Sequence, residues 1–177
     1  LLTHKMLSDV TKRLNDVMEL DASICEYVGV PVNYSFGLGR FRAISAVGGR
    51  AFLPEFGFNP TEIRDMLLTG EINSISAVPT LWRVLLKMKS IFGHESLNLK
   101  WIEIGSQYMS RGEKEELKIL FPNAIIVQHY GLTEASRTTF LRIDQETGER
   151  LESVGTGDGN TEIEISDSGC ICIRGSH

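Results

Sequence analysis

Apolar side chains recur along the chain at two spacings, one typical of helices and one typical of buried strands. A period of three to four predicts helices at residues 3–19, 34–46, 60–69, 80–92 and 110–120. Short apolar runs between them predict strands at residues 27–32, 51–56, 73–78, 99–104 and 124–127. This repeated alternation of strand and helix predicts an α/β fold with a mainly parallel, doubly wound sheet flanked by helices.

Several of the predicted helices carry recognisable start and stop residues. Thr3 is suited to cap the first helix. Residues 59–62 (Asn-Pro-Thr-Glu) combine a capping asparagine, a proline at the first helical position and a glutamate placed as in a capping box. Gly70 is placed to end that helix, and residues 110–113 (Ser-Arg-Gly-Glu) predict another capping box.

The pattern changes after Glu134. Short alternating runs at residues 138–143, 162–166 and 170–174 predict strands, and residues 167–169 (Asp-Ser-Gly) predict a hairpin turn between the last two. We therefore expect a small antiparallel β appendage at the C-terminal end of the α/β part.

This change divides the chain into an α/β subdomain at residues 1–137 and an antiparallel segment at residues 138–177, which would begin a β subdomain. The chain starts at the edge of a helix and ends directly after a strand, so we expect both ends to be truncated. Residues 174–177 (Arg-Gly-Ser-His) are either native or the beginning of a purification tag, and the sequence leaves both open.

Length and charge narrow the class of protein. With 177 residues and a net charge of −5, the chain forms one domain or a piece of a larger one. Its basic residues form no block that would favour a nucleic-acid partner, and no apolar run reaches the length of a membrane span. Cys25, Cys170 and Cys172 form neither a disulfide framework nor a zinc-ligand pattern. We expect a reducing compartment and a cytoplasmic location.

The most informative stretch is residues 128–134 (Gln-His-Tyr-Gly-Leu-Thr-Glu), which directly follow a predicted strand. Parallel strands bring the residues after their carboxyl ends to one edge of the sheet, where open α/β folds bind ligands. Tyr130 offers a ring that can stack on a base, Thr133 a hydroxyl for a phosphate oxygen, and Glu134 a carboxylate for Mg²⁺. An ordinary polar turn has a similar composition, so this stretch alone leaves both interpretations open.

A second candidate loop, residues 105–107 (Gly-Ser-Gln), follows the preceding predicted strand. Because the two strands are sequential, we expect the two loops to lie side by side, with small residues along the edge of a base. Gly37 and Gly39 are too few for a dinucleotide fingerprint and are interpreted as a tight turn with close packing. Trp82 has the spacing of helix packing and is predicted to belong to the core.

These residues resemble motifs of the adenylate-forming superfamily, which includes acyl- and aryl-CoA synthetases, adenylation domains of peptide synthetases and firefly luciferase. Residues 130–134 (Tyr-Gly-Leu-Thr-Glu) resemble its central adenylate-binding motif. Further segments resemble family motifs in the family's order: 2–4 after the phosphate loop, 31–37 in the acyl pocket, 77–80 at a Val-Pro-Thr turn, 104–107 at the adenine loop, and 154–155 and 171–175 at later Val-Gly and Val-Arg-Gly segments. The resemblance covers essentially the whole chain and implies an internal fragment of the family's large N-terminal domain.

The resemblance implies that the parent protein is an ATP-dependent acid–thiol ligase, such as an acyl-CoA synthetase. In this family a carboxylate attacks the α-phosphate of ATP, pyrophosphate leaves, and the acyl-adenylate is passed to a thiol. The implied ligands are a small carboxylic acid, ATP or AMP, Mg²⁺, and coenzyme A or a carrier thiol. Neither a nucleic-acid partner nor a membrane span is implied.

The resemblance also implies a role for each matching residue. Thr133 and Glu134 are the implied catalytic residues, and Glu134 is the implied Mg²⁺ ligand. The implied nucleotide-binding residues are Gly105, Ser106, Gln107, His129, Tyr130, Gly131 and Thr133. Tyr34, Phe36 and Gly37 are implied to line the acid pocket.

Departures from the family pattern bear on substrate and activity. Tyr34 stands where many acyl-activating members have His and amino-acid-activating members have Asp, which favours a fatty or aromatic acid over an α-amino acid. Ser106 and Gln107 replace the usual Gly-Ala, so we expect a narrower or more polar adenine pocket. The family's phosphate loop would precede Leu1 and its catalytic lysine would follow His177, so the fragment alone is predicted to be inactive.

Two other interpretations stay open at this level. A non-catalytic, flavodoxin-like module that binds a nucleotide or a partner would show the same alternation, because fold does not determine function. The chain would also fit a purely structural middle segment of a longer enzyme. Glu134 beside Thr133 at the end of a strand favours the ligase, since a scaffold does not need this pair.

Overall fold

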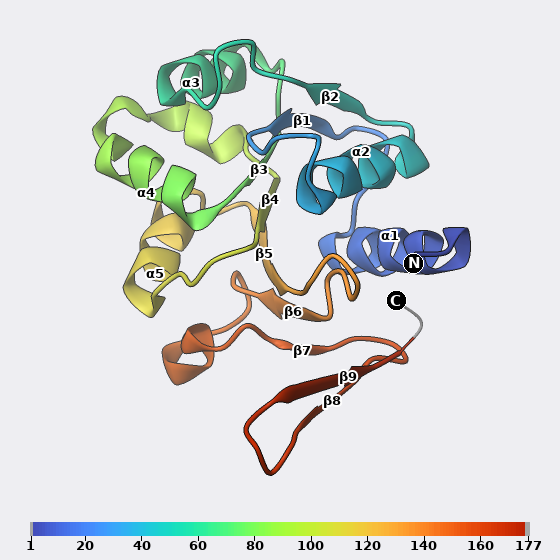
Figure 1. Cartoon of the computed structure of the whole chain (residues 1–177). Coiled ribbons are helices and arrows are strands. Elements are labelled where there is room, and N and C mark those ends of the chain that lie inside the picture. The colour runs from blue at the N-terminus through green and yellow to red at the C-terminus, as the bar shows by residue number, and fades with distance from the viewer. Residues whose placement is uncertain (1, 176–177) are drawn as a thin grey trace.

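The computed structural model of the chain describes residues 2–175, so residues 176–177 of the possible tag lie outside the described part. The strands are β1 (Cys25–Val28), β2 (Arg50–Phe52), β3 (Ser74–Ala77), β4 (Trp101–Ile104), β5 (Ile125–Tyr130), β6 (Thr139–Arg142), β7 (Thr156–Gly157), β8 (Glu162–Ile165) and β9 (Ile171–Arg174). Within the described residues, seven strands form one sheet in the order β2-β1-β3-β4-β5-β6-β7 (Figure 1). The first five in this order are parallel, which confirms the predicted mainly parallel sheet.

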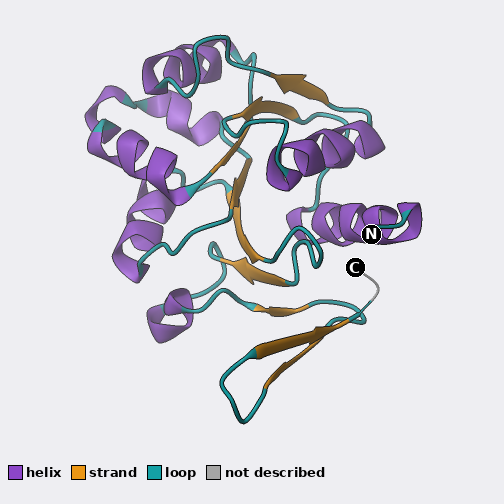
Figure 2. Cartoon of the chain, in the orientation of Figure 1, coloured by secondary structure: helices purple, strands orange, loops and turns teal. Residues whose placement is uncertain are grey.

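Helices cover both faces of this sheet, as a doubly wound fold requires. They are α1 (His4–Met18), α2 (Ser35–Val47), α3 (Pro60–Thr69), α4 (Pro79–Lys87) and α5 (Arg111–Leu120). Helices α1 and α2 lie on one face, and α3, α4 and α5 lie on the other (Figures 1 and 2). Among residues 2–175, no helix has both the length and the apolar character needed to cross a bilayer.

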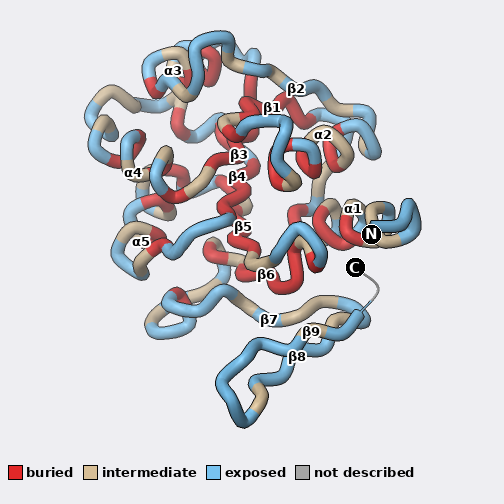
Figure 3. Tube along the Cα trace, in the orientation of Figure 1, coloured by how far each residue is buried: buried red, intermediate tan, exposed pale blue. Residues whose placement is uncertain are grey.

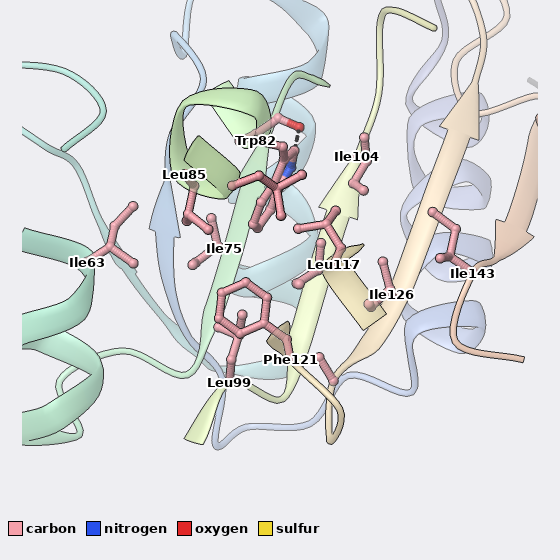
Figure 4. Packing of buried hydrophobic residues seen from close by; sticks show 14 of the residues in the cluster. Ile63, Ile75, Trp82, Leu85, Leu99, Ile104, Leu117, Phe121, Ile126 and Ile143 are labelled. Carbon is pink, nitrogen blue, oxygen red and sulfur yellow. Dashed lines mark hydrogen bonds between the residues drawn. The ribbon is translucent and has the colours of Figure 1, made fainter. Parts of the chain in front are cut away.

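The larger core lies between the sheet and helices α3 to α5. Trp82 is fully buried there, and its indole N–H donates to the carbonyl oxygen of Ala77 at 3.1 Å (Figure 4). Phe121 packs edge-on against Trp82, with ring centroids 6.3 Å apart. The buried indole with a satisfied N–H confirms the predicted core role of Trp82.

The antiparallel C-terminal part is divided between two sheets. Strand β6 pairs antiparallel with β5, and β7 pairs with β6, so both extend the main sheet. Only β8 and β9 form the separate hairpin that the sequence predicts, and its residues are largely exposed (Figure 3). The small antiparallel appendage is thus confirmed for the hairpin, whereas the strand predicted at 138–143 belongs to the main sheet. The domain boundary after residue 137 stays a prediction.

Three strands end three or four residues away from their predicted ends, and the other predicted strands agree with the structure to within two residues. The strand predicted at 27–32 is β1, which begins earlier because Glu26 is buried within it and interrupts the apolar run. The strand predicted at 51–56 is the three-residue edge strand β2. The strand predicted at 124–127 continues as β5 through Tyr130, because β6 supplies pairing partners for His129 and Tyr130.

The predicted helix caps are confirmed except for the side chain of Glu62. Thr3 caps α1, Gly70 ends α3 with φ 74°, and Ser110 forms a capping box with Glu113. The prediction of a second capping box at residues 59–62 is wrong. The carboxylate of Glu62 accepts from the hydroxyl of buried Tyr27 at 2.8 Å instead, so tertiary packing takes the side chain away from the cap.

Asn59, the N-cap of α3, allows a direct measurement of the contribution of helix capping to stability. Its side-chain oxygen accepts from the backbone N–H groups of Thr61 and Glu62 at the start of α3. We expect Asn59→Ala to lower the free energy of unfolding by about 1 kcal/mol, because two helix-end donors lose their acceptor. Urea denaturation measures this, with the exposed turn residue Asn160→Ala as the control. Equal stability of the two variants would contradict the capping role.

Candidate functional site

A polar pocket of about 220 Å³ opens at the carboxyl ends of β4 and β5. Its open side carries four hydroxyl groups, from Ser35, Ser106, Thr133 and Ser136, together with Gly131 and Leu132. No carboxylate side chain lines it among the described residues. Hydroxyl and backbone donors without a competing carboxylate suit the oxygens of a phosphate or carboxylate group.

The inner side of the pocket is formed by three buried residues, Phe36, His129 and Arg137, which we call the pocket floor. The rings of Phe36 and His129 meet edge-to-face, with centroids 4.8 Å apart and planes at 88°. The guanidinium carbon of Arg137 lies 5.6 Å from the centroid of the Phe36 ring. The floor is therefore closed by mutual contact of three side chains.

The pocket brings together five of the residues proposed from the sequence. They come from three separate segments and are Phe36, Ser106, His129, Gly131 and Thr133. The other six proposed residues do not line it: Tyr34, Gly37, Gly105, Gln107, Tyr130 and Glu134.

Among these six, the residues of the two ligand loops lie beside the pocket. Gln107 accepts from the hydroxyl of Thr80 at 2.8 Å, and Glu134 is exposed next to Thr133. Tyr130 is half-buried at the end of β5. The roles that the resemblance implies for all these residues stay predictions.

The turn after β4 has an unusual backbone. Ser106 has φ 78°, the left-handed region that disfavours a side chain by roughly 1–2 kcal/mol. Gly105 lies directly against the His129 ring, and an added Cβ there would collide with the ring. Gly105 therefore allows the close approach of the two loops that the sequence predicts.

The loop after β5 is closed by two bonds to one carbonyl. The backbone N–H of Leu132 and the hydroxyl of Thr138 both donate to the carbonyl oxygen of Ala135, at 3.0 and 2.8 Å. Arg137 ends this loop with φ 53° and has a fully buried side chain. Its backbone carbonyl in turn accepts from Arg13 of α1 at 3.1 Å.

A buried ionic cluster lies beneath the pocket floor, between the sheet and α2. Its centre is Glu103 of β4, which is fully buried. Arg137 Nε lies 2.8 Å from one Glu103 oxygen, and Arg40 Nη1 lies 2.9 Å from the other. His129 Nδ1 lies 2.7 Å from Glu103 Oε1, at an angle outside that of a regular hydrogen bond. Glu103 thus connects β4, β5, α2 and the loop that carries Thr133.

The cluster is electrically balanced by a second carboxylate. Arg40 also pairs with buried Glu26 of β1 through two of its nitrogens, and Nε lies 2.7 Å from Glu26 Oε1. Ser74 of β3 donates to Glu26 at 3.0 Å. Two guanidinium groups therefore meet two carboxylates, which is the pairing that makes buried charge tolerable.

This environment shifts two pKa values. Burial alone would raise the pKa of Glu103, but the charges of Arg137 and Arg40 outweigh it and hold the pKa well below its ordinary value. Burial lowers the pKa of His129, although neighbouring Glu103 acts in the opposite direction. At neutral pH Glu103 is therefore charged and His129 is neutral.

The ionic cluster and part of the pocket were not predicted from the sequence. Glu26 and Glu103 lie inside predicted strands, and Arg40 lies on the apolar side of a predicted helix. Charged side chains at positions predicted to be buried are rare unless they pair with an opposite charge. These three residues were therefore the features from which a buried ionic cluster could have been inferred. Ser136 and Arg137 follow the recognised motif directly, but nothing in their spacing indicates a pocket.

Comparison with known proteins gives a family and several relatives. The family described as AMP-binding enzyme matches residues 1–177. The acyl-CoA ligase sidI of Aspergillus fumigatus is 25% identical over 187 residues, which cover 99% of this chain and 32% of that protein. The 2-succinylbenzoate–CoA ligase of Listeria monocytogenes is 26% identical over 157 residues, which cover 89% of this chain and 32% of that protein. The chain thus spans about a third of the length of the curated relatives it matches.

Solved structures show the same fold. A long-chain fatty acid–CoA ligase from Archaeoglobus fulgidus superposes with a TM-score of 0.81 at 21% identity, covering 99% of this chain and 39% of that one. ATP-bound MatB from Rhodopseudomonas palustris gives a TM-score of 0.80 at 18% identity, covering 99% and 36%. These similarities confirm the fold.

The buried cluster predicts a large effect of Glu103 on stability. We expect Glu103→Gln to lower the free energy of unfolding by about 3–5 kcal/mol, because it leaves Arg137 and Arg40 without their shared counter-charge. Urea denaturation measures the change. Glu116→Gln breaks the exposed pair with Lys89 and is the matched control, for which we expect less than about 1 kcal/mol. Similar decreases in the free energy of unfolding for both variants would contradict a larger stabilising role of the buried cluster.

The lowered pKa of His129 predicts a pH dependence of stability. As the pH falls through the ordinary histidine value of 6.5, the unfolded chain takes up a proton before folded His129 does. The free energy of unfolding therefore decreases on acidification, by at most about 1.4 kcal/mol per pH unit for this group. We expect His129→Gln to flatten the dependence between about pH 7 and pH 5, measured by urea denaturation at each pH. His94→Gln, at an exposed histidine, should retain the slope, and an unchanged slope in His129→Gln would refute the assignment.

Proposed function

Because this chain belongs to the AMP-binding enzyme family, we propose that it is the central part of an acid–thiol ligase. Such an enzyme activates a carboxylic acid as an acyl-adenylate with ATP and transfers the acyl group to coenzyme A or a carrier thiol. The observation that carries the proposal is the polar pocket at the ends of β4 and β5. It joins residues of both predicted ligand loops, and hydroxyl groups dominate its open side.

The pocket residues have complementary roles in this proposal. Thr133 and the backbone at Gly131 bind the α-phosphate oxygens, and Ser106 borders the nucleotide. Donors fixed before the reaction stabilise the charge that develops on these oxygens in the transition state. Tyr130 packs on the adenine, which contributes about 1–3 kcal/mol where an aromatic ring stacks on a base.

Glu134 is the residue suited to hold Mg²⁺. Its carboxylate is exposed beside Thr133, and it makes no hydrogen bond or ion pair with another residue in the described part of the chain. The same part of the chain contains no group of three or more metal-binding side chains. A single carboxylate fits Mg²⁺, because phosphate oxygens and water complete its shell. The ion, when bound, supplies neutralisation of phosphate charge.

The acid is proposed to be a fatty or aromatic carboxylic acid rather than an α-amino acid. Tyr34 is exposed before the first turn of α2 and offers no carboxylate for a substrate ammonium group. The relatives are named acyl-CoA ligase and 2-succinylbenzoate–CoA ligase, which supports coenzyme A as the acceptor. The ATP-bound state of MatB supports ATP as the activating nucleotide.

The chain is further proposed to act within a longer cytoplasmic polypeptide and to be inactive alone. In this proposal the family's phosphate loop and catalytic lysine belong to parts of the longer polypeptide other than residues 1–177. Without that loop and lysine, a transfer at phosphorus loses most of its charge stabilisation. In the same proposal residues 138–177 begin the β subdomain, to which the β8–β9 hairpin contributes a separate two-stranded sheet.

A flavodoxin-like binding module is the second candidate. The strand order 2-1-3-4-5 favours it, since such folds bind their ligand where the order reverses, between β1 and β3. The ends of β1 and β2 border a separate hollow of about 410 Å³, lined mostly by apolar residues. Family membership and the polar pocket at β4 and β5 favour the ligase.

Tyr130 provides the test that separates these functions. We expect Tyr130→Ala to weaken binding of a non-hydrolysable acyl-adenylate analogue by about tenfold to a hundredfold, because the stacking surface is lost. Isothermal calorimetry on the full-length protein measures this. Phe56→Ala removes an exposed aromatic ring outside the site and is the control. Binding that is indifferent to both Tyr130→Ala and Thr133→Ala would exclude the proposed nucleotide site.

A further inference from the structure

Within the proposed ligase function, we propose that Glu152 is a positioning residue for the loop that follows β4. It lies in the short 3-10 helix η3 (Gly148–Glu152), far along the chain from the loop at residues 105–109. Glu152 and Tyr108 form a pair that we call the clasp, and the clasp holds Ser106 at the pocket. This inference rests on the proposed function and adds to it a residue that does not line the pocket.

The loop at residues 105–109 depends on support from other elements because its backbone is strained. Its two ends, Gly105 and Met109, are buried, whereas the three residues between them are exposed. Ser106 has φ 78°, a region that residues other than glycine rarely adopt. Without bonds to other elements, the loop would favour a backbone conformation that does not hold Ser106 at the pocket.

The clasp supplies such a bond. The hydroxyl of Tyr108 donates to one carboxylate oxygen of Glu152 at 2.6 Å. The other oxygen accepts at 3.1 Å from the backbone N–H of Arg111, the first residue of α5. The hydrogen bond from Tyr108 lowers the pKa of Glu152, so the acceptor is charged at neutral pH, and hydrogen bonds to a charged acceptor are the stronger kind. One carboxylate therefore bonds both the loop and the helix that follows it.

Lys114 of α5 fixes the position of Glu152. Its side chain is buried, and its Nζ donates to the backbone carbonyl of Leu151 and, at 3.0 Å, to that of Ser153. These two carbonyls flank Glu152 in the sequence. The segment that carries Glu152 can leave α5 only if a buried ammonium group loses both acceptors, which is unfavourable. The clasp is thus attached to a fixed part of the structure.

Helix α4 holds the same loop through two further bonds. The hydroxyl of Thr80 donates to the side chain of Gln107, and Arg83 Nη2 donates to the backbone carbonyl of Tyr108, both at 2.8 Å. Helix α5 packs against both α4 and η3, so the loop that leads into α5 is bonded to an element on each side of that helix (Figure 1). Ser106 precedes these bonded residues directly, and its conformation is fixed through them.

Binding of AMP to the full-length protein, measured by isothermal calorimetry, tests the inference. We expect Tyr108→Phe to raise the Kd for AMP about threefold to tenfold, because fewer molecules then hold the loop in its binding conformation. In the Ser106→Gly background the same change should raise the Kd less than about twofold, because glycine adopts a positive φ without steric cost. A merely structural role of Tyr108 would weaken binding equally in both backgrounds.

Two glutamate variants provide a second measurement and its control. Glu152→Ala removes the acceptor of both bonds and should weaken AMP binding at least as much as Tyr108→Phe. Glu149→Ala removes the same charge from an exposed position of the same short helix, and we expect its Kd to equal that of the wild type.

The outcomes separate the inference from the proposed function. A Kd for AMP that is unchanged in Tyr108→Phe and Glu152→Ala, or an equal weakening with and without Ser106→Gly, overturns the inference while the ligase function stands. Absence of AMP binding by the wild type would instead overturn the proposed function and the inference together.

Discussion

The buried carboxylate of Glu103 is the interaction on which the geometry of the site depends. It lies in the central part of the sheet, and its partners come from α2, from the end of β5 and from the loop that follows. Each of these elements supplies part of the pocket. Because removal of one partner from a buried pair typically costs about 3–5 kcal/mol, the three elements are held in one arrangement.

The cluster also explains how the pocket stays polar although a buried arginine forms part of its floor. Arg137 faces Phe36 with one side of its guanidinium and bonds Glu103 with its nitrogens. The positive charge of Arg137 is therefore paired with Glu103 inside the cluster. The open side of the pocket is left to hydroxyl groups, which bind anionic oxygens without a fixed charge of their own.

The regular parts of the fold were predictable because they depend on local periodicity and capping. The helices, the parallel pairing and the hairpin follow from spacing and turn residues alone, although the helix predicted at 80–92 ends at Lys87 as α4. The extension of β5 through Tyr130 was not, because it depends on pairing with β6. Glu62 shows the same limit of local signals. Its position fits a capping box, but its carboxylate accepts a hydrogen bond from Tyr27, which is distant in sequence. The ionic cluster joins residues as far apart as Glu26 and Arg137, and periodicity carries no information about such pairs.

The extension of β5 through Tyr130 places side chains on both sides of the sheet edge. Successive side chains of a strand point to opposite faces of the sheet. Val127 packs in the core on the α1 and α2 face, so His129 points to that face, and Ile126 packs in the opposite core, so Tyr130 points there. Gln107 is held on that same opposite side by Thr80 of α4. The side chains of Tyr130 and Gln107 therefore lie on one side of this sheet edge and that of His129 lies on the other. Adjacent residues of one strand thus belong to two separate environments, so the two sides of the sheet edge can change independently in sequence.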